Sequence, residues 1–450
     1  MRHRFRGKHE SKGWNMTDKQ SDLFLQQVGD ELRKCVKCGA CQSVCPIYQE
    51  TKREKYVARG KIALVDAVSQ GRLPYTDEFD TVVHNCLLCL SCVEVCSSNV
   101  RVDKIVTAAR SSLVQERGLP WPKRLASRTL RAGRSLRNAL FQGGSLAQTL
   151  LFHRLPESSG LRRRFPVPGV DKGQTVPRLA WVPFRNRHAG LVQAERATGQ
   201  VVLFTGCAAN YIYPTIAEAT LWVLKKMGQS VHIPARQMCC SAPAESHGDQ
   251  ETVHELARQN LLALAEDNQQ DPVIVICSSG GYMFKRIYPD LFCSEKERDL
   301  AQHLAARTLD ISEFLVKRIG LEALGRQIDN PCQEMTTYHD PCHLKRGQGV
   351  WEEPRQLLRL ACPEHFVPLD QADRCCGQGG TYGLTHREMS QSILGHKLQS
   401  IQISGASQVA TGCPACMIQI QDGVSRWGQS VQVRHTIEIL ATAMGWPGAE

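Results

Sequence analysis

Residues 35–46 read CVKCGACQSVCP and place four cysteines at gaps of two, two and three residues, with a proline after the fourth. Residues 86–97 read CLLCLSCVEVCS and repeat the cysteine spacing, although serine replaces the proline. Three cysteines at gaps of two residues let one tight loop bind three corners of a cubane [4Fe-4S] cluster, and the fourth reaches the cluster of the other block. The two blocks therefore predict two [4Fe-4S] clusters.

In this crossed arrangement, each cluster takes three ligands from one block and the fourth from the other. We expect one cluster on Cys35, Cys38, Cys41 and Cys96, and the second on Cys86, Cys89, Cys92 and Cys45. The small residues Gly39 and Ser91 should let backbone amides approach the sulfides and set the potentials. Zinc is the alternative metal, because C-x2-C pairs also form zinc sites, but two complete runs of this spacing favour iron.

The later cysteines form two groups that repeat each other. One group contains Cys207, Cys239, Cys240 and Cys277, and the other contains Cys342, Cys375, Cys376, Cys413 and Cys416. Corresponding cysteines are 135 or 136 residues apart, which indicates an internal duplication. Apolar patterns predict strands at 201–204, 273–276, 336–338 and 408–410, and helices at 216–227, 354–360 and 386–398.

Helical patterns at 21–33, 59–68 and 102–113 surround the first cysteine blocks. The expected fold is α+β overall, with an N-terminal helical ferredoxin-like module for two [4Fe-4S] clusters followed by two duplicated α/β cysteine-rich domains. We divide the chain into a basic N-terminal extension (1–20), the two-cluster domain (21–117), a basic connector (118–200), the first cysteine-rich repeat with a degenerate motif (201–330) and the second repeat with the complete motif (331–450).

Composition narrows the class of protein further. No apolar run approaches the roughly 20 residues of a membrane-spanning helix, which argues against an integral membrane protein. Residues 1–15 are basic and polar and lack the layout of a secretory signal. We therefore expect a cytoplasmic protein whose 20 cysteines are metal ligands or redox groups rather than disulfides. Met16 is an alternative start, which would make residues 1–15 an upstream extension without a role in the fold.

Positive charge is concentrated in the connector, where residues 118–200 hold 15 Lys and Arg against 3 Asp and Glu. Leucines are interspersed with arginines over 121–155, as in a basic amphipathic helix that lies on an anionic membrane surface or a partner protein. The alternative is a helix packed across the protein's own domains. The prolines at 166, 168 and 177 predict an extended strap, and we expect no nucleic-acid partner.

The complete motif carries five cysteines that are expected to meet. Each is expected to follow a strand, at the sheet edge where this fold class binds ligands. A tetrahedral zinc ion takes four ligands, so five thiolates with a vicinal pair favour a multi-iron cluster. The glycines at 377, 379 and 380 would permit close backbone approach.

His339, Asp340 and His343 flank Cys342 as candidates for a proton relay, a further ligand or a structural role. Cys293, Cys332 and Cys362 are expected to be ordinary thiols.

Together these motifs resemble the cysteine-rich-domain family of iron-sulfur proteins, over nearly the whole chain after Met16. That family includes the iron-sulfur subunit of glycolate oxidase, the related D-lactate dehydrogenases and the catalytic subunits of heterodisulfide reductase. Segments 205–207, 375–382 and 435–438 are most similar to the glycolate oxidase branch, as is Arg59-Gly60-Lys61. The resemblance implies a noncubane [4Fe-4S] cluster on Cys342, Cys375, Cys376, Cys413 and Cys416. In the first repeat, Gly280 replaces the last cysteine, so whether Cys207, Cys239, Cys240 and Cys277 hold zinc, an altered cluster or no metal is open.

No dinucleotide fingerprint, P-loop or nucleophile elbow occurs, so we assign no flavin and no catalytic residue to this chain. The resemblance implies the electron-transfer subunit of a glycolate or D-lactate dehydrogenase. An FAD-containing oxidase subunit would supply electrons, and this chain would pass them toward a quinone or another respiratory acceptor at the cytoplasmic face of the inner membrane. The alternative is a heterodisulfide reductase-like subunit that reduces a disulfide at the noncubane cluster. A third class, a structural zinc protein or a nucleic-acid binder, would be distinguished by metal analysis.

Overall fold

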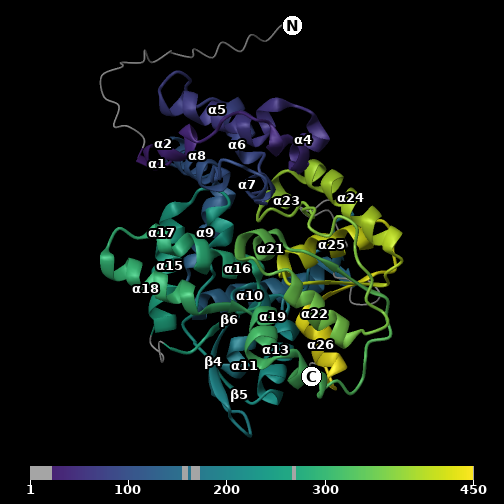
Figure 1. The fold of residues 1–450 in the computed structure, drawn as a ribbon. Helices are drawn as coiled ribbons and strands as arrows, with labels where there is room; N and C mark the ends of the chain where they lie inside the picture. The colour runs from purple at the N-terminus through teal and green to yellow at the C-terminus, as the bar shows by residue number, and fades with distance from the viewer. Residues whose placement is uncertain (1–22, 155–160, 164–172, 266–269, 449–450) are drawn as a thin grey trace, which may run out of the picture.

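The computed structural model describes residues 23–154, 161–163, 173–265 and 270–448. The predicted extension at 1–20 and the prolines at 166 and 168 lie outside these residues. Within them, a helical N-terminal unit lies over two α/β units (Figure 1). This arrangement confirms the expected α+β class, a helical module followed by two duplicated α/β units.

Short helices joined by the cysteine loops build the N-terminal unit. Its elements are α1 (Leu23–Gln27), α2 (Gly29–Arg33), α3 (Ala40–Val44), α4 (Pro46–Thr51), η1 (Glu54–Tyr56), α5 (Ala58–Ser69), α6 (Asp77–His84), α7 (Ser91–Glu94) and α8 (Val102–Arg117). Helices α5 and α8 contain the predicted helices at 59–68 and 102–113. The expected helix at 21–33 is interrupted at Val28, whose φ of −106° and ψ of 9° leave the helical region.

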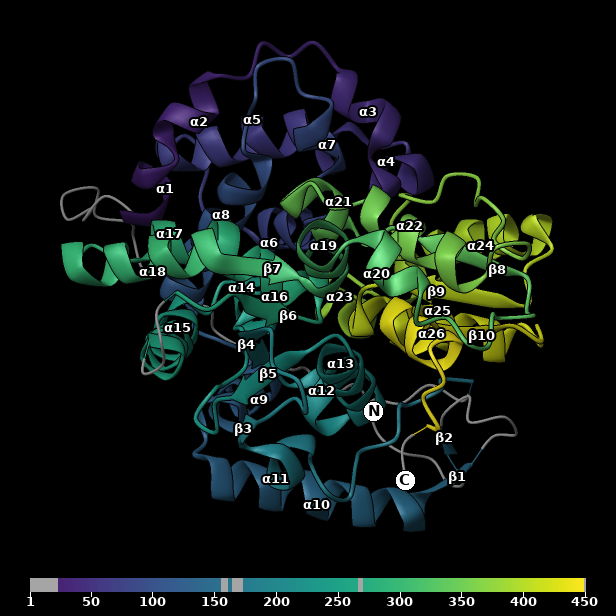
Figure 2. The ribbon, with the colours of Figure 1, turned by 60° about the horizontal axis from the view of Figure 1, so that its bottom comes forward.

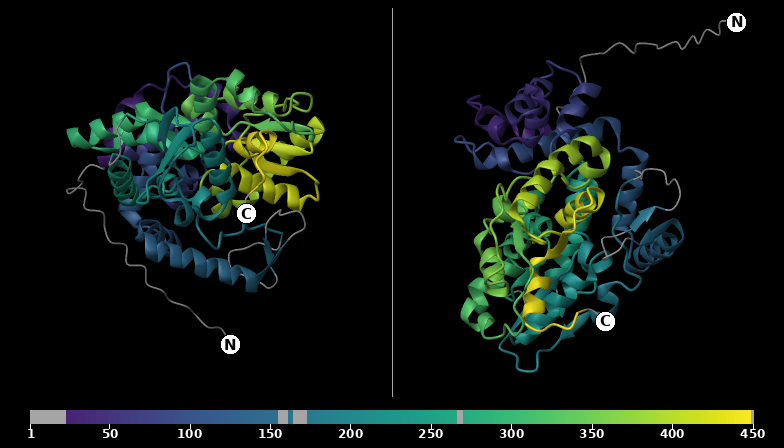
Figure 3. Two further views of the ribbon diagram at one scale, coloured as in Figure 1. Left: turned by 90° about the horizontal axis from the view of Figure 1, so that it is seen from below. Right: turned by 90° about the vertical axis from the view of Figure 1, so that its right-hand side faces the viewer.

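The connector contains α9 (Trp121–Arg131), α10 (Arg134–Leu151), β1 (Phe152–Arg154), β2 (Leu161–Arg163), α11 (Phe184–His188) and β3 (Gly190–Val192). The helix suggested over 121–155 is therefore two helices. Ala132 and Gly133 are extended, with ψ of 141° and 157°. Arg137 of α10 donates to the carbonyls of Leu130 and Ala132 at 3.4 and 3.2 Å, which satisfies acceptors at the end of α9. Helix α10 follows the outer edge of the molecule (Figures 2 and 3).

A five-stranded sheet of order β3-β5-β4-β6-β7 forms the centre of the first repeat, and only β3 runs antiparallel to its neighbour. The apolar strands β4 and β6 are buried, as expected for a parallel sheet with helices on both faces. The elements are β4 (Gly199–Phe204), α12 (Ala208–Tyr211), α13 (Pro214–Lys226), β5 (Gln229–Ile233), α14 (Ala242–Glu245), α15 (Gln250–Ala265), β6 (Val273–Val275), α16 (Ser278–Tyr282), η3 (Met283–Ile287), α17 (Tyr288–Leu291), α18 (Glu295–Arg307), β7 (Thr308–Asp310), α19 (Ile311–Phe314), η4 (Leu315–Ile319) and α20 (Leu321–Gly325).

The second repeat has a parallel sheet of order β10-β9-β8. Its elements are β8 (Thr336–His339), α21 (Cys342–Gln348), α22 (Glu352–Ala361), α23 (Tyr382–Thr385), α24 (Arg387–Ser404), β9 (Gln408–Thr411), α25 (Pro414–Arg426), β10 (Gln432–His435) and α26 (Thr436–Ala443). Cys342 and Cys413 follow β8 and β9, as expected. The expectation fails for Cys375 and Cys376, which follow a loop that pairs with the sheet only through a bridge between Phe366 and Thr336 in the described residues.

The two repeats share one hydrophobic core. Ile216 and Leu224 of α13 belong to the same buried cluster as Ile437 and Leu440 of α26. The N-terminal unit packs on this pair of repeats through α4 against α24 and α7 against α21. The cysteine loops of all three units are therefore held by one continuous packed structure. None of the described helices has the length and hydropathy needed to cross a bilayer.

Candidate metal centres

Two cysteine-lined cavities lie in the N-terminal unit. One is lined by Cys35, Cys38, Cys41 and Cys96, and the other by Cys45, Cys86, Cys89 and Cys92. The structure thus brings together both crossed sets of cysteines that the spacing suggested. Cys92 lines both cavities, so the two sites are neighbours. Four thiol donors around each small cavity fit the donor set of a [4Fe-4S] cluster.

Left-handed backbone at matching positions shapes the two cysteine loops. Lys37 and Gly39 have φ of 58° and 88°, and Leu88 and Leu90, at the same positions in the second block, have φ of 52° and 64°. Such alternation turns successive amide groups toward one centre and forms a concavity that suits anionic clusters. Leu90, rather than Ser91, is thus the counterpart of Gly39. The hydroxyl of Ser91 instead lies 3.4 Å from the sulfur of Cys89.

Two cations at the start of α5 line the cavities, and neither was predicted from the sequence as a site residue. Lys61 is only 2% exposed and lines the second cavity, while Arg59 lines the first. Between them, a Cβ on Gly60 would lie 2.1 Å from the carbonyl oxygen of Glu54, so only glycine fits without a shift of the backbone. The sequence did contain a signal for Lys61, because it is a lysine on the apolar face of a predicted helix that follows a cysteine block.

Burial raises the pKa of thiols in both cavities. The pKa of Cys45 rises to about 11 because its thiol is removed from water, while the charge of Lys61 acts in the opposite direction. Burial also raises the pKa of Cys41, and Arg59 opposes this shift. Because the thiolate is the metal ligand, binding here must displace protons, which a cationic iron core favours.

The five cysteines of the complete motif converge where the second repeat meets the N-terminal unit. Cys342 begins α21, Cys413 and Cys416 lie at the start of α25, and the vicinal pair lies in the loop before α23. Their thiols contact one another in series, in the order Cys342, Cys375, Cys376, Cys416 and Cys413. Four of the five are buried and Cys342 is half-buried. A shielded group of five soft donors suits a multi-iron centre.

This thiol group also meets the second cavity of the N-terminal unit. The thiol of Cys375 contacts that of Cys89, and both residues belong to one hydrophobic cluster. His343, one of the candidate relay residues, has its Nε2 atom 3.1 Å from the carbonyl oxygen of Leu88. Tyr382 donates a hydrogen bond of 2.8 Å to Asn85. His343 and Tyr382 of the second repeat thus both form hydrogen bonds with the N-terminal unit at the junction between the two sites.

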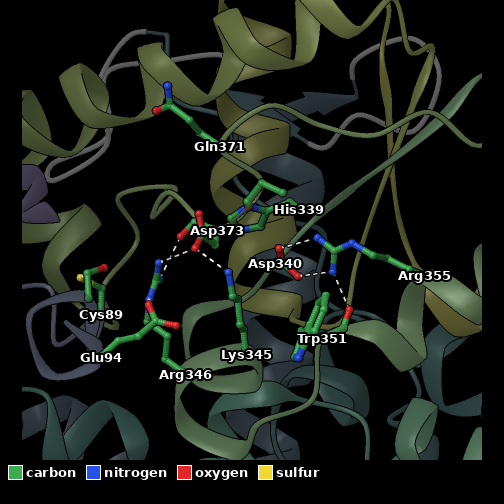
Figure 4. Close-up of polar contacts among 12 residues, drawn as sticks. Cys89, Glu94, His339, Asp340, Lys345, Arg346, Trp351, Arg355, Gln371 and Asp373 are labelled. Carbon is green, nitrogen blue, oxygen red and sulfur yellow. Dashed lines mark hydrogen bonds and ion pairs between the residues drawn. The ribbon is translucent and has the colours of Figure 1, made fainter.

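Ion pairs connect charged side chains of the second repeat with one another and with the N-terminal unit (Figure 4). Arg346 of α21 contacts Asp373 at 2.9 Å and also reaches Glu94 of α7 at 2.7 Å, which links the repeat to the N-terminal unit. Asp340 is paired with Arg355 at 2.6 Å. Among the candidate relay residues, Asp340 is thus engaged in a buried ion pair.

His339 lies beside two thiols of the group, and Lys397 interacts electrostatically with the cysteine pair. A ring nitrogen of His339 and the sulfurs of Cys376 and Cys416 all lie within 4.8 Å of one another. Burial lowers the pKa of His339 to about 3, so the ring is neutral at pH 7 and suited to metal ligation. Lys397, which was not predicted from the sequence, is fully buried and donates to the carbonyl oxygen of Gln371 at 2.6 Å.

The cysteines of the degenerate motif are divided between two neighbourhoods. The sulfurs of Cys207 and Cys239 lie 3.9 Å apart, and Cys239 contacts Cys240. Cys277 instead places its thiol against Cys413 of the second repeat, while remaining close to Cys207.

The remaining three cysteines lie outside these groups. Cys332 and Cys362 both have their sulfurs 3.8 Å from the hydroxyl of Thr336, and Cys293 is exposed.

Comparison with known proteins finds family models that match segments of all three units. A family model for a 4Fe-4S dicluster domain matches residues 31–100, and one for a cysteine-rich domain matches residues 201–285 and 336–421. The "Probable glycolate oxidase iron-sulfur subunit" of Bacillus subtilis (strain 168) is 29% identical, over 95% of this chain and 97% of its own length. "Lactate utilization protein A" of Geobacillus kaustophilus (strain HTA426) is 30% identical, over 54% of this chain and 98% of its own length.

More distant proteins resemble most of the chain. One subunit of the "Dihydromethanophenazine:CoB--CoM heterodisulfide reductase" of Methanosarcina barkeri is 26% identical, over 92% of this chain and 94% of its own length. The crystal structure of a hypothetical protein from Helicobacter pylori shares the fold, with a TM-score of 0.51 and 11% identity over 94% of this chain and 76% of that one. The chain belongs to the cysteine-rich-domain family of iron-sulfur proteins, as do the relatives named as a glycolate oxidase iron-sulfur subunit and as lactate utilization protein A.

Proposed function

We propose that this iron-sulfur electron-transfer chain serves a flavin-dependent glycolate or D-lactate dehydrogenase. An FAD-containing partner subunit would oxidise the 2-hydroxy acid, and this chain would carry the electrons toward a quinone or another respiratory acceptor. The names of the B. subtilis and G. kaustophilus relatives support this substrate class. The acid would bind on the partner, so the selectivity for glycolate or lactate would belong to that partner.

The observation that carries the proposal is an unbroken series of thiol sites through the molecule. The two N-terminal cavities share Cys92, and Cys89 of the second cavity contacts Cys375 of the C-terminal group. At the other end, Cys38 is exposed and Val36 beside it is 69% exposed. Redox centres in these sites would lie near enough for rapid transfer, with one end open to a partner.

We propose two cubane [4Fe-4S] clusters in the N-terminal cavities and one noncubane [4Fe-4S] cluster on the five cysteines of the complete motif. Protein purified without oxygen should then contain about twelve iron atoms and as many acid-labile sulfides per chain. An iron content near eight atoms per chain would contradict the assignment of the noncubane cluster. Zinc without sulfide would contradict the whole assignment.

The test of the function is reduction of the clusters by substrate. The full chain should be purified together with its partner, whose flavin should be identified by fluorescence. Addition of glycolate or D-lactate should bleach the visible absorption of the clusters, and the isolated chain should show no bleaching. Bleaching by a dithiol, without bleaching by either acid in the presence of the flavoprotein, would contradict the proposal.

Bleaching by a dithiol and not by either acid is the result expected for the alternative, a heterodisulfide reductase-like subunit. The similarity to the M. barkeri protein over 92% of the chain supports this alternative. The replacement of a cysteine by Gly280 weakens it, because the first repeat then lacks one ligand of the complete motif.

We also propose that α9 and α10 hold this cytoplasmic protein on an anionic membrane surface. Leu136, Leu140 and Leu150 of α10 are 59, 47 and 68% exposed, and Trp121 of α9 is 76% exposed. These apolar side chains lie within the segment that carries 15 basic residues. Exposed apolar side chains within a basic segment suit the interface of a bilayer that contains anionic lipids.

Sedimentation with vesicles tests this surface. Binding to phosphatidylglycerol vesicles should exceed binding to phosphatidylcholine vesicles, and replacement of both Leu136 and Leu140 by Glu should weaken it by about tenfold or more. The matched control is Ile403→Glu, since Ile403 is 75% exposed on α24. Equal loss in the control, or equal binding to both vesicles, would contradict the proposal.

A further inference from the structure

We infer that Cys277 of the first repeat is a ligand of the metal centre held by the second repeat. It would be the sixth thiol of that centre, beside Cys342, Cys375, Cys376, Cys413 and Cys416. The inference rests on the proposed multi-iron centre of the second repeat and adds a ligand that the motif of that repeat does not contain.

The position of its thiol places Cys277 at this centre. Cys277 and Cys413 each precede a helix at the end of a parallel strand, and their side chains are in contact across the junction of the repeats. The backbone of Ser278 donates to the carbonyl of Gly412 at 3.2 Å, and the side chain of Ser278 contacts the thiol of Cys413. The two loops therefore meet at their metal-binding residues.

Close helix packing holds this junction closed. Helix α16, which follows Cys277, lies against α21, which begins at Cys342. A Cβ on Gly281 would lie 2.4 Å from the amide of Gln348, and a Cβ on Gly347 would lie 2.5 Å from the ring of Tyr282. Gln348 also donates to the carbonyl of Ser278 at 2.9 Å. Two glycines in contact with these side chains let the helices approach closely enough to place Cys277 at the centre of the second repeat.

Cys239 and Cys207 of the first repeat pack in a different cluster from the thiols of the second repeat. Cys239 packs in a small cluster with Met238 and Leu256, and Cys207 borders this cluster. Cys376, Cys413 and Cys416 belong instead to the main core of the two repeats. Cys277 is near Cys207, but its direct thiol contact is with Cys413. The fourth cysteine of the degenerate motif is thus retained as part of the complete site.

The experiment compares Cys277→Ser with Cys239→Ser in the full chain, purified without oxygen and studied by electron paramagnetic resonance and Mössbauer spectroscopy. Cys277→Ser should shift the g values of the noncubane signal and weaken its retention of iron by roughly tenfold or more against a chelator. Cys239→Ser should leave that signal unchanged. The signals of the two cubanes serve in each sample as the standard for correct folding.

The outcomes separate this inference from the proposed function. A noncubane signal in Cys277→Ser that superimposes on the wild-type signal would overturn the ligand assignment while leaving electron transfer intact. A shift in Cys239→Ser equal to that in Cys277→Ser would also overturn it, because both residues would then serve the first repeat. A wild-type protein without a third signal would overturn both the noncubane centre and its sixth ligand. If Cys277→Ser lacks the cubane signals, Cys277→Ala supplies the same comparison.

Discussion

Cys277 in the first repeat and Cys413 in the second occupy equivalent places in their α/β units. Their φ and ψ angles are −148° and 118° in one, and −143° and 114° in the other. The repeats diverge three residues later, where Gly280 corresponds to Cys416. A Cβ on Gly280 would approach Phe204 to 3.7 Å and other atoms no closer, so packing does not require glycine there. The sheet and its helices thus determine the backbone conformation of the loop. A metal-ligating cysteine can therefore be replaced without loss of the fold.

The two repeats also hold a buried cation in the same way. Lys397 donates to the carbonyls of Gln371 and Ala372, which precede the cysteine pair of the second repeat. Arg185 donates to the carbonyl of Gln237, which precedes the pair of the first repeat. Burial lowers the pKa of Lys397 to about 8 and that of Arg185 to about 10, so both are charged at pH 7. Each repeat thus keeps a positive charge beside its thiols, whether or not the motif is complete.

The largest expected difference between the repeats is in iron content. Cys376→Ser should remove the noncubane centre and about four iron atoms per chain, while sparing both cubane signals. The equivalent variant in the first repeat, Cys240→Ser, should leave the iron content unchanged if that repeat holds no iron-sulfur cluster of its own. Iron and sulfide analysis with paramagnetic resonance makes the measurement. Equal loss of iron in the two variants would end the distinction between a complete and a degenerate site.

A smaller difference is expected in stability. Gly377 follows the cysteine pair of the second repeat with φ of 91°, and its Cβ would lie 2.6 Å from the carbonyl oxygen of Ser390. Gly377→Ala should therefore lower the free energy of unfolding by about 2–4 kcal/mol. Gly280→Ala, at a helical position with room for a Cβ, should change it by less than about 1 kcal/mol. Urea unfolding under anaerobic conditions would measure both. A similar cost at the two positions would show that Gly280 is constrained after all.

The smallest expected effect is on the reduction potential. Lys397→Met removes a buried positive charge beside Cys376 and should disfavour the reduced, more negative state of a bound centre. The potential should fall by on the order of 100 mV, for one charge several ångströms away at an effective dielectric constant near 20. Arg185→Met should leave this potential unchanged, because Arg185 lies in the connector, beside Cys207 of the first repeat. A redox titration followed by paramagnetic resonance tests the pair, and an equal shift in both variants would count against separate electrostatic environments.

Local patterns in the sequence predicted much of the architecture and the grouping of the N-terminal cysteines. A cubane cluster is only a few ångströms across, so one short loop can supply three of its ligands, and their spacing is then visible as C-x2-C-x2-C. Four parallel strands were visible as short apolar runs, although the parallel strands β5, β7 and β10 were not anticipated. The break between α9 and α10 was missed because the leucine pattern continues through Ala132 and Gly133, where Arg137 satisfies the end of α9.

Contacts between units were decided only in the tertiary structure. The sequence alone showed the cysteine spacing, the duplication and the loss of a cysteine at Gly280, and it predicted the strands β4, β6, β8 and β9. It did not predict that Cys89 meets Cys375, that Cys277 meets Cys413, or that Lys61 and Lys397 lie beside the thiols. The reason is physical: a motif describes neighbours along one loop, whereas these contacts depend on helices that approach closely where Gly281 and Gly347 leave space. Spacing determines which residues can bind a metal, and packing determines which of them share it.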